Sequence, residues 1–584
     1  MTNFKYILFL VALIVASCND DFLNRVPESE LNNETFWTSE ASMEIYNNGI
    51  YNEAGNNGQY YFLKGYYSAP WQSGYIGMGW EDCRSDNGAP KDANLNRYQV
   101  VASGQHVIDD NPDFRGWNWS LLRRINFFLA NFDKTPVSEE VKNKYAGEAR
   151  FFRAWFYFDK VKRFGDVPWI DEPLNTESEA LFAGRDSRVL IMENVLEDIN
   201  FAIDNLPSDW GKPGRFDKWV ALALKSRICL YEGSYRKYHG VGEDVDKWFQ
   251  NAADAAEEII TEGPFSLFDN NDPQNDYNML FRQLDLSNNP EVLAFRKYVM
   301  GVNGHRYNGY QRARANGLTK DMVEDYLCTD GKPIELSSEY QGDNTIRAVY
   351  ANRDPRLRQT SLHPDDAEKY LSQADFEAGP YPRFLGMVGG WKTTTGYTMI
   401  KYFDVPDFNK GYGQEENDAI LFRLGEVLLN FAEAKAELGS ITQADLDNSI
   451  NKLRDRVDMP HLTMNVEMDP KYADEGLSAL LIEIRRERRV ELAYEGFRYD
   501  DLMRWAKGAY LEKRVLGMRF EEETAAEYPN AQLETIEIDG KKYIDVYQGS
   551  TFENRTFDPD KHYLFPIARS VIAQNPTIEQ NPGW

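Results

Sequence analysis

Helical spacing of apolar residues runs through most of this 584-residue chain and constrains its fold more than any other feature. Nine segments have the pattern of helices with one buried face. They cover residues 41–51, 117–132, 139–163, 188–206, 218–238, 248–261, 421–438, 443–456 and 477–493. Strand patterns are few and lie at residues 293–298 and in short runs after residue 527. Because strands do not alternate with helices, the sequence predicts a mostly α fold and disfavours a TIM barrel or a Rossmann fold.

One pair of these segments indicates how the helices pack. Residues 218–238 and 248–261 follow each other closely, and the second segment carries alanines at positions 252, 253, 255 and 256. Such small side chains let a neighbouring helix approach closely. The pair resembles a tetratricopeptide-type helix hairpin, although the strict repeat signature is absent. The sequence therefore predicts a tetratricopeptide-like helix-pair scaffold.

We expect a single body after a short N-terminal segment. Residues 18–265 would form an N-terminal helical half that contains an irregular aromatic loop at residues 55–101. Residues 266–584 would form a long, irregular, loop-rich insert and a C-terminal helical half, with few short strands.

Residues 1–17 have the pattern of a signal peptide. The apolar run at residues 6–16 is shorter than the roughly 20 residues that a membrane-spanning helix needs. Residues 15–18, Val-Ala-Ser-Cys, resemble a bacterial lipobox, so we expect cleavage before Cys18 and a lipid on its thiol; the alternative is an ordinary signal peptide with a chance cysteine. Residues 19–21, Asn-Asp-Asp, resemble an export signal for Gram-negative lipoproteins. The sequence thus predicts a lipid-anchored protein exposed at the outer-membrane surface.

Charge and motif content exclude several classes of function. The chain has 93 acidic and 65 basic residues, and the resulting net charge of -28 disfavours a nucleic-acid partner. It lacks Gly-x-Ser-x-Gly, a Walker loop, His-Glu-x-x-His and clustered Cys/His spacing, so we expect no cofactor, no metal and no enzymatic activity. Carboxylate pairs for glycoside hydrolysis remain open because acidic residues are numerous.

Two segments have strong patterns that favour a structural role. Phe151, Trp155, Phe158 and Val161 recur at helical spacing, as core residues do. Four glutamates, at positions 483, 487, 491 and 495, are each four residues apart. Such a row of like charge destabilises a helix unless basic groups face it. We expect a structural ion-pair network rather than a metal site, with partners drawn from Arg486, Arg488, Arg489 and Arg498, and from Arg150 and Arg153 on the aromatic helix.

Five distinctive stretches and a two-part C-terminal closure are spread from residue 147 to the C-terminus. They are residues 147–168 (GEARFFRAWFYFD to RFGDVP), 329–334 (TDGKPI), 352–357 (NRDPRL), 422–434 (FRLGEVLLNFAEA), 484–502 (IRRERRVELAYEGFRYDDL), and the closing runs 563–567 (YLFPI) and 575–584 (NPTIEQNPGW). Together with the lipobox they resemble the SusD/RagB family of outer-membrane glycan-binding lipoproteins. The likeness covers the whole chain from Cys18.

This resemblance implies a surface protein that captures a glycan and delivers it to a SusC-like TonB-dependent transporter, over which it sits as a lid. Some members of the family handle peptides instead. The sequence also leaves open a helical surface glycosidase or polysaccharide lyase, and a structural subunit that contacts only the transporter. The net charge favours a neutral glycan over sulfated or uronic-rich ones.

Candidate ligand-binding residues follow from sugar chemistry rather than from the family. Aromatic rings stack on the apolar face of a sugar, while Asn, Asp and Arg bond its hydroxyl edge. Loops rich in glycine and aromatic residues supply both, and long irregular segments are usually functional. The candidates are Trp71, Tyr75, Trp80, Arg84 and Asp86 in the aromatic loop, Arg306, Tyr307 and Tyr310 in a second segment, and Trp391 in a third. The alternative is a hydrophobic plug or a partner-protein surface.

Overall fold

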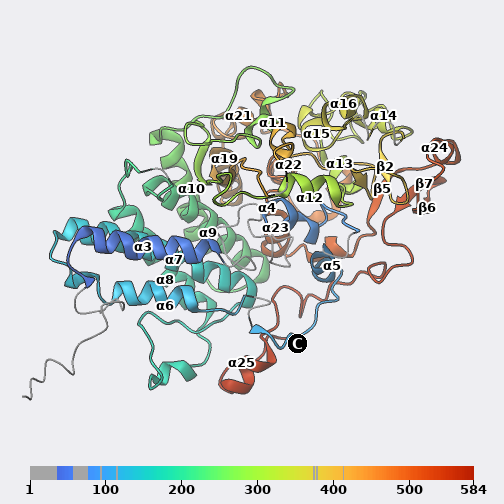
Figure 1. Ribbon diagram of the computed structural model, residues 1–584. Coiled ribbons are helices and arrows are strands. Elements are labelled where there is room, and N and C mark those ends of the chain that lie inside the picture. The colour runs from blue at the N-terminus through green and yellow to red at the C-terminus, as the bar shows by residue number, and fades with distance from the viewer. Residues whose placement is uncertain are drawn as a thin grey trace, which may run out of the picture.

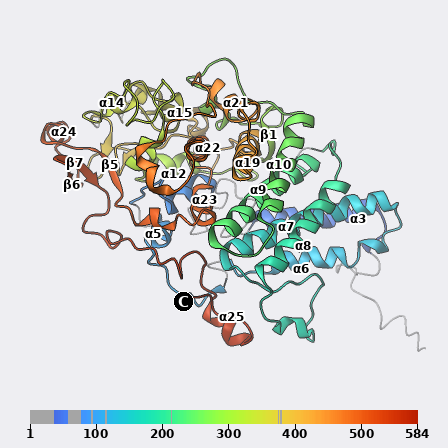
Figure 2. The same ribbon diagram turned by 180° about the vertical axis from the view of Figure 1, so that it is seen from behind.

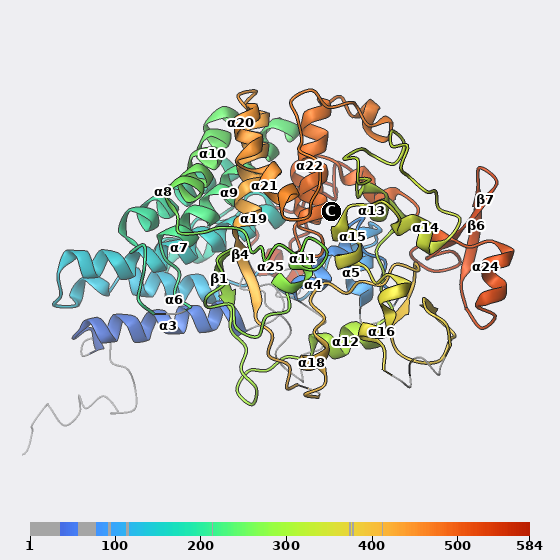
Figure 3. The ribbon, with the colours of Figure 1, turned by 90° about the horizontal axis from the view of Figure 1, so that it is seen from above.

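The computed structural model describes residues 36–56, 77–91, 95–112, 116–212, 214–372, 375, 379–411 and 413–584. The predicted mostly α architecture is confirmed, with few short strands. The early helices gather on one side of the molecule and the loop-rich segments on the other (Figures 1 and 3). Within these described ranges, no helix combines the length and apolarity that crossing a membrane requires.

Six helices form the N-terminal side. They are α3 (Glu40–Asn56), α6 (Ser120–Leu129), α7 (Glu139–Phe164), α8 (Arg188–Asn205), α9 (Lys218–His239) and α10 (Val245–Glu262). The ends of α7 follow from its sequence, because the Ser138 hydroxyl accepts a hydrogen bond from the Val141 N–H and Gly165 ends the helix at a positive φ of 69°. All six match predicted segments to within a few residues.

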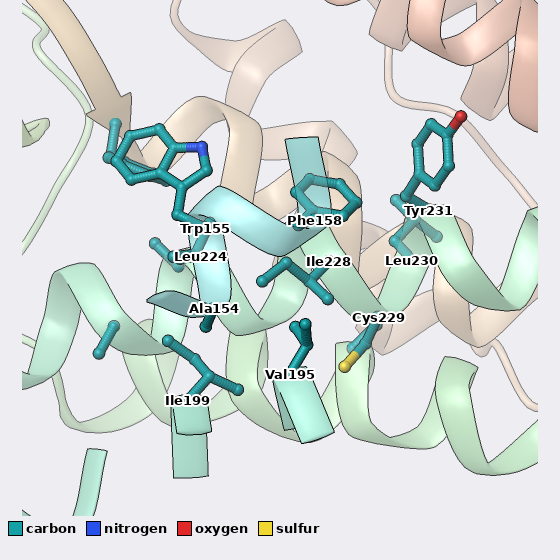
Figure 4. Packing of buried hydrophobic residues seen from close by; sticks show 14 of the residues in the cluster. Ala154, Trp155, Phe158, Val195, Ile199, Leu224, Ile228, Cys229, Leu230 and Tyr231 are labelled. Carbon is teal, nitrogen blue, oxygen red and sulfur yellow. The ribbon is translucent and has the colours of Figure 1, made fainter. Parts of the chain in front are cut away.

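The aromatic stripe of α7 is core, as predicted. Phe151, Trp155, Phe158 and Val161 are all buried. Figure 4 shows Trp155 and Phe158 of α7 together with residues of α8 and α9, among them Val195 and Ile228. The helices α9 and α10 also pack closely, since a Cβ atom at Gly233 would lie 3.0 Å from the Phe249 ring. These helices therefore form one continuous core.

The C-terminal half adds three helices to that core. Helix α19 (Leu424–Glu437) packs between α10 and α22 (Ala479–Glu491), and α23 (Arg498–Arg504) follows against α9 (Figure 2). Strand β1 (Val292–Arg296) pairs antiparallel with β4 (Ala419–Arg423).

Two predicted helices in this half differ from the structure. The segment at residues 421–438 begins in strand β4, because its first residues pair with β1 instead of forming a helical turn. The segment at 443–456 is divided into α20 (Gln443–Asp447) and α21 (Ile450–Asp455), since Ser449 between them has a non-helical backbone.

Short elements fill the loop-rich part. The helices are α4 (Met78–Glu81), α5 (Asn96–Ala102), α11 (Asp276–Leu280), α12 (Tyr307–Ala313), α13 (Lys320–Asp325), α14 (Ile346–Tyr350), α15 (Pro355–Thr360), α16 (Ala367–Tyr370), α18 (Val405–Phe408), α24 (Glu522–Glu527) and α25 (Arg569–Gln574). Strands β2 (Arg383–Phe384) and β3 (Lys392–Thr393) pair in parallel. Strands β5 (Leu516–Arg519), β7 (Lys541–Asp545) and β6 (Glu534–Ile538) form a sheet in that order.

The four spaced glutamates form a buried ion-pair network, which confirms the prediction. We call Glu483, Glu487 and Glu491 on α22, with Glu495 in the turn after it, the carboxylate stripe. The Glu491 carboxylate accepts hydrogen bonds from Arg423 and Arg456 at 2.7 Å each and from Arg356 at 2.9 Å. Burial opposes ionisation, but these guanidinium groups hold the pKa of Glu491 well below its usual value.

The other stripe members have equally close partners. Glu495 bonds Lys401 and Arg423, both at 2.7 Å. Glu487 forms an ion pair with Arg356 at 2.6 Å and accepts a hydrogen bond from Arg454 at 2.9 Å. Each of these side chains is at most 4% exposed, so the network lies inside the protein.

Most of the predicted partners of the stripe were wrong. Arg486 does pair with Glu483, at 3.0 Å. Arg488 instead bonds Asp501, Arg489 and Arg498 bond Asp86, and Arg150 and Arg153 lie against Asp198. The true partners come from distant segments that helical spacing alone does not reveal.

Replacing Glu491 by glutamine should strongly destabilise the protein. Three arginines would then lose their shared carboxylate inside the core, and breaking a buried pair typically costs about 3–5 kcal/mol. Urea or thermal unfolding measures the loss. The control is Glu139→Gln, whose side chain is 76% exposed and which should change stability by less than about 1 kcal/mol. Equal stability of the two variants would contradict the role of the network.

Candidate functional site

The three predicted ligand segments meet around α12. The ring of Trp80 packs against that of Tyr307, with centroids 5.4 Å apart. The Trp391 N–H donates a hydrogen bond to the Arg312 carbonyl at 2.8 Å. Figures 1 and 3 show α4, which carries Trp80, near α12. Segments far apart in the chain thus converge on one short helix.

Three of the predicted rings are buried where they meet. Trp80 and Tyr307 are each 1% exposed and belong to a hydrophobic core on the loop-rich side. Trp391 is fully buried and packs edge-on against Phe403 at 4.4 Å. The prediction that Trp80, Tyr307 and Trp391 each present a ring to a ligand is therefore corrected, because all three are buried. Irregular loops can bury large rings without any periodic signal in the sequence.

Arg84 and Asp86 have structural partners. The Asp86 carboxylate accepts hydrogen bonds from two Arg498 nitrogens at 2.8 Å and lies 3.0 Å from Arg489. Arg84 pairs with Glu81 at 2.8 Å. The contacts of Asp86 hold this part of the predicted aromatic loop against α22 and α23.

Asp82 completes this attachment. It is fully buried and accepts hydrogen bonds from the N–H groups of Tyr494 at 2.7 Å and Gly496 at 3.2 Å. Both residues have positive φ, which fixes the turn between α22 and α23. The Asn87 amide also donates to Asp82, at 2.9 Å. Burial nevertheless raises the pKa of Asp82 to about 6.

That elevated pKa predicts a pH dependence of stability. An unfolded aspartate has a pKa near ~3.9, so between about pH 4 and 6 the folded protein binds the Asp82 proton more tightly than the unfolded chain does. Asp82 should therefore raise stability as pH falls from 7 to 4.5, by on the order of 2 kcal/mol. Unfolding at both pH values, with Asp82→Asn beside the unchanged protein, measures this contribution. An identical pH dependence in both proteins would contradict it.

Among the predicted aromatic ligand residues that the structure describes, Tyr310 is the one that is only partly buried, and it packs against the hydrophobic core on the loop-rich side. The guanidinium carbons of Arg306 and Arg314 lie 5.0 and 5.6 Å from its ring centroid. Arg306 itself is buried, so one cation backs the ring from inside. We call Tyr310 with Arg306 and Arg314 the α12 face. A ring of this kind can stack on the apolar side of a sugar.

Sequence reasoning missed a neighbouring aromatic contact. Phe408 of α18 is partly exposed, and the Arg312 guanidinium lies 5.7 Å from its centroid. Arg312 also pairs with Asp375 at 2.9 Å. In the sequence, this contact was indicated only by the position of Arg312 close to Tyr310, on what proves to be the same short helix.

A cavity of about 140 Å³ lies where the two halves of the molecule meet. Its wall includes Met78, Tyr499 and Phe565. The basic groups in the wall have carboxylate partners: Arg84 with Glu81, Lys162 with Asp500, Arg163 with Asp159, Arg227 with Glu426, Arg423 with Glu495, Arg488 with Asp501 and Arg504 with Glu433. The cavity is smaller than the roughly 300–1,000 Å³ of most ligand pockets, so we interpret it as a packing gap between the halves.

Three predicted functional residues fall outside the described ranges. Trp71 and Tyr75 in the aromatic loop, and Cys18 as the lipid attachment site, stay predictions.

Comparisons with known proteins cover nearly the whole chain. A family model described as "SusD family" matches residues 257–584, and one described as "Starch-binding associating with outer membrane" matches residues 21–230. A SusD-like protein of Formosa agariphila is 24% identical over 534 residues, which is 89% of this chain and 95% of that protein.

Solved structures share the fold. A SusD-like carbohydrate binding protein from Bacteroides fragilis is 25% identical with a TM-score of 0.72, covering 93% of this chain and 100% of that one. A laminarin binding SusD-like protein is 19% identical with a TM-score of 0.62, covering 94% and 100%.

Proposed function

The chain belongs to the SusD family, and we propose that it captures a glycan at the outer surface of the outer membrane and delivers it to a SusC-like TonB-dependent transporter. The observation that carries the proposal is the α12 face, where a partly exposed Tyr310 has two guanidinium groups at 5.0 and 5.6 Å from its ring centroid. Two structural neighbours support it, one a carbohydrate binding protein and the other a laminarin binding protein.

The α12 face has the chemistry that a sugar requires. A pyranose ring presents C–H groups on one face and hydroxyls around its edge. The Tyr310 ring would stack on that face, while the neighbouring arginine N–H groups would donate to hydroxyl oxygens. The α12 face consists of a tyrosine and two arginines and contributes no carboxylate pair of the kind that glycoside hydrolysis uses. We therefore propose that the protein binds the glycan without hydrolysing it.

We propose a neutral glycan as the ligand. The net charge of -28 repels polyanions at long range. Arg306, Arg312 and Arg314 carry positive charge near the α12 face, and because screening at physiological salt acts over about 8 Å, this local charge competes with the net charge at contact distance. Calorimetry against laminari-, malto- and xylohexaose, with polygalacturonate and carrageenan fragments as the acidic set, decides this. Tight binding to the acidic set alone would contradict a neutral ligand.

Alanine variants of two tyrosines on α12 distinguish an effect on glycan binding from an effect on stability. Tyr310→Ala should weaken binding of the tightest neutral hexasaccharide by about tenfold or more, which corresponds to about 1.4 kcal/mol for a lost stacking ring. Tyr307→Ala should instead lower stability by about 3–5 kcal/mol, because its ring is buried against Trp80. Calorimetry and thermal unfolding are measured on both variants.

Three outcomes would contradict the proposed site. Unchanged affinity in Tyr310→Ala would remove the α12 face from binding. New reducing ends after incubation with the hexasaccharide would indicate an enzyme. Failure of the isolated protein to bind any glycan would favour a subunit that contacts only the transporter or handles peptides.

The anchor is tested separately in cells. We propose that the Cys18 thiol carries the lipid that holds the protein at the surface. Cys18→Ala should then abolish surface labelling of intact cells, because the thiol of Cys18, the first residue after the expected cleavage, is the single attachment point. Ser17→Ala, which keeps a small residue before the cysteine, is the matched control and should label normally. Normal labelling of both variants would contradict lipid anchoring through Cys18.

A further inference from the structure

Helix α12 is too short to hold its own position. It has seven residues, Tyr307–Ala313, whereas isolated helices shorter than about 12–15 residues are marginal in water. The residue before it, Arg306, makes no side-chain capping bond to the first turn. The orientation of Tyr310 therefore depends on contacts from other segments.

Glu415 supplies the missing cap from a distant loop. Its Oε2 accepts a hydrogen bond from the Asn308 N–H at 2.7 Å, and its Oε1 accepts one from the Gly309 N–H at 2.9 Å. These are first-turn amides, which have no partner inside the helix. The carboxylate also lies at the positive end of the helix dipole. Glu415 is 1% exposed, so water does not compete for these bonds.

Backbone bonds fix Glu415 beside the helix. The Glu415 carbonyl accepts from the His305 N–H at 2.8 Å, and the Glu415 N–H donates back to the His305 carbonyl at 3.3 Å. A Cβ atom at Gly309 would lie 3.3 Å from Glu415 Oε1, so glycine permits the close approach.

The loop that carries Glu415 is itself anchored. The Asp407 carboxylate accepts from the N–H groups of Glu416 at 2.9 Å and Asn417 at 3.2 Å. The Asn308 side chain, on α12, donates to the Asn417 amide oxygen at 3.1 Å. The loop and α12 therefore form one hydrogen-bonded unit.

We propose that Glu415 is a positioning residue for glycan binding, which fixes the first turn of α12 so that Tyr310 presents its ring to the sugar. This inference rests on the proposed function of the α12 face. Glutamine at this position keeps the shape but has one acceptor oxygen, and its NH₂ group would face an N–H donor. The first turn then loses one of its two bonds and the charge beside the dipole.

The test is a double-mutant cycle on affinity for the tightest of laminari-, malto- and xylohexaose. Glu415→Gln should weaken binding at least about fivefold, but should have no further effect in a Tyr310→Ala background, because it acts through that ring. Glu416→Gln is the matched control: this neighbouring carboxylate bonds Lys410 at 2.6 Å and the Met300 N–H at 2.9 Å, and should leave affinity within about twofold.

Each result has one meaning. Unchanged affinity in Glu415→Gln, or an equal loss in both backgrounds, overturns the positioning role while leaving the proposed site intact. Unchanged affinity in Tyr310→Ala overturns the site and the positioning role together. If Glu415→Gln does not fold, Glu415→Asp keeps the charge but is too short for both amides, and should lose affinity by an intermediate factor. Full affinity in Glu415→Asp overturns the inference.

Discussion

The buried carboxylate stripe holds together the part of the molecule that lacks long helices. A buried carboxylate is unfavourable unless it is paired and fully hydrogen-bonded, so the stripe is stable only with its cations in place. Those cations come from α15, β4, Arg456 at the end of α21, and Lys401. Arg489 and Arg498, from α22 and α23, extend the same arrangement to Asp86. One charged network thus joins segments that also share a hydrophobic core, to which Leu357, Ile420 and Val490 belong.

Sequence patterns predicted helix bounds and core positions, which depend on neighbouring residues. They did not predict contacts between segments that meet only in the folded protein. The bounds of α7 follow from Ser138 and Gly165, and the core role of Phe151 and Trp155 from their spacing. The glutamate spacing predicted a network but not Arg423 or Arg456 within it, since those partners meet α22 only after folding. Residues 421–423 joined a strand for the same reason, because pairing with β1 outweighed their helical pattern.

For the candidate site, the sequence predicted residue types better than exposure. It identified Trp80, Tyr307 and Trp391, which do lie close together around α12. Nothing in their spacing, however, distinguishes a ring packed under a loop from one exposed to solvent. Tyr310 and Tyr307 are three residues apart on one helix, yet one is partly exposed and the other is core. No sequence pattern indicated Glu415, because its proposed role depends on its contact with α12 in the folded protein. A short helix held by a buried carboxylate lets a rigid core support a surface ring.

Backbone hydrogen exchange with and without bound sugar tests the central claim, that glycan binds at the α12 face, most directly. The protein is exchanged alone and with a saturating amount of the neutral hexasaccharide that it binds tightest. Binding at the α12 face predicts slower exchange in residues 306–314, with the amides of α7 and α9 unchanged. Slowed exchange elsewhere, with residues 306–314 unaffected, would contradict the account.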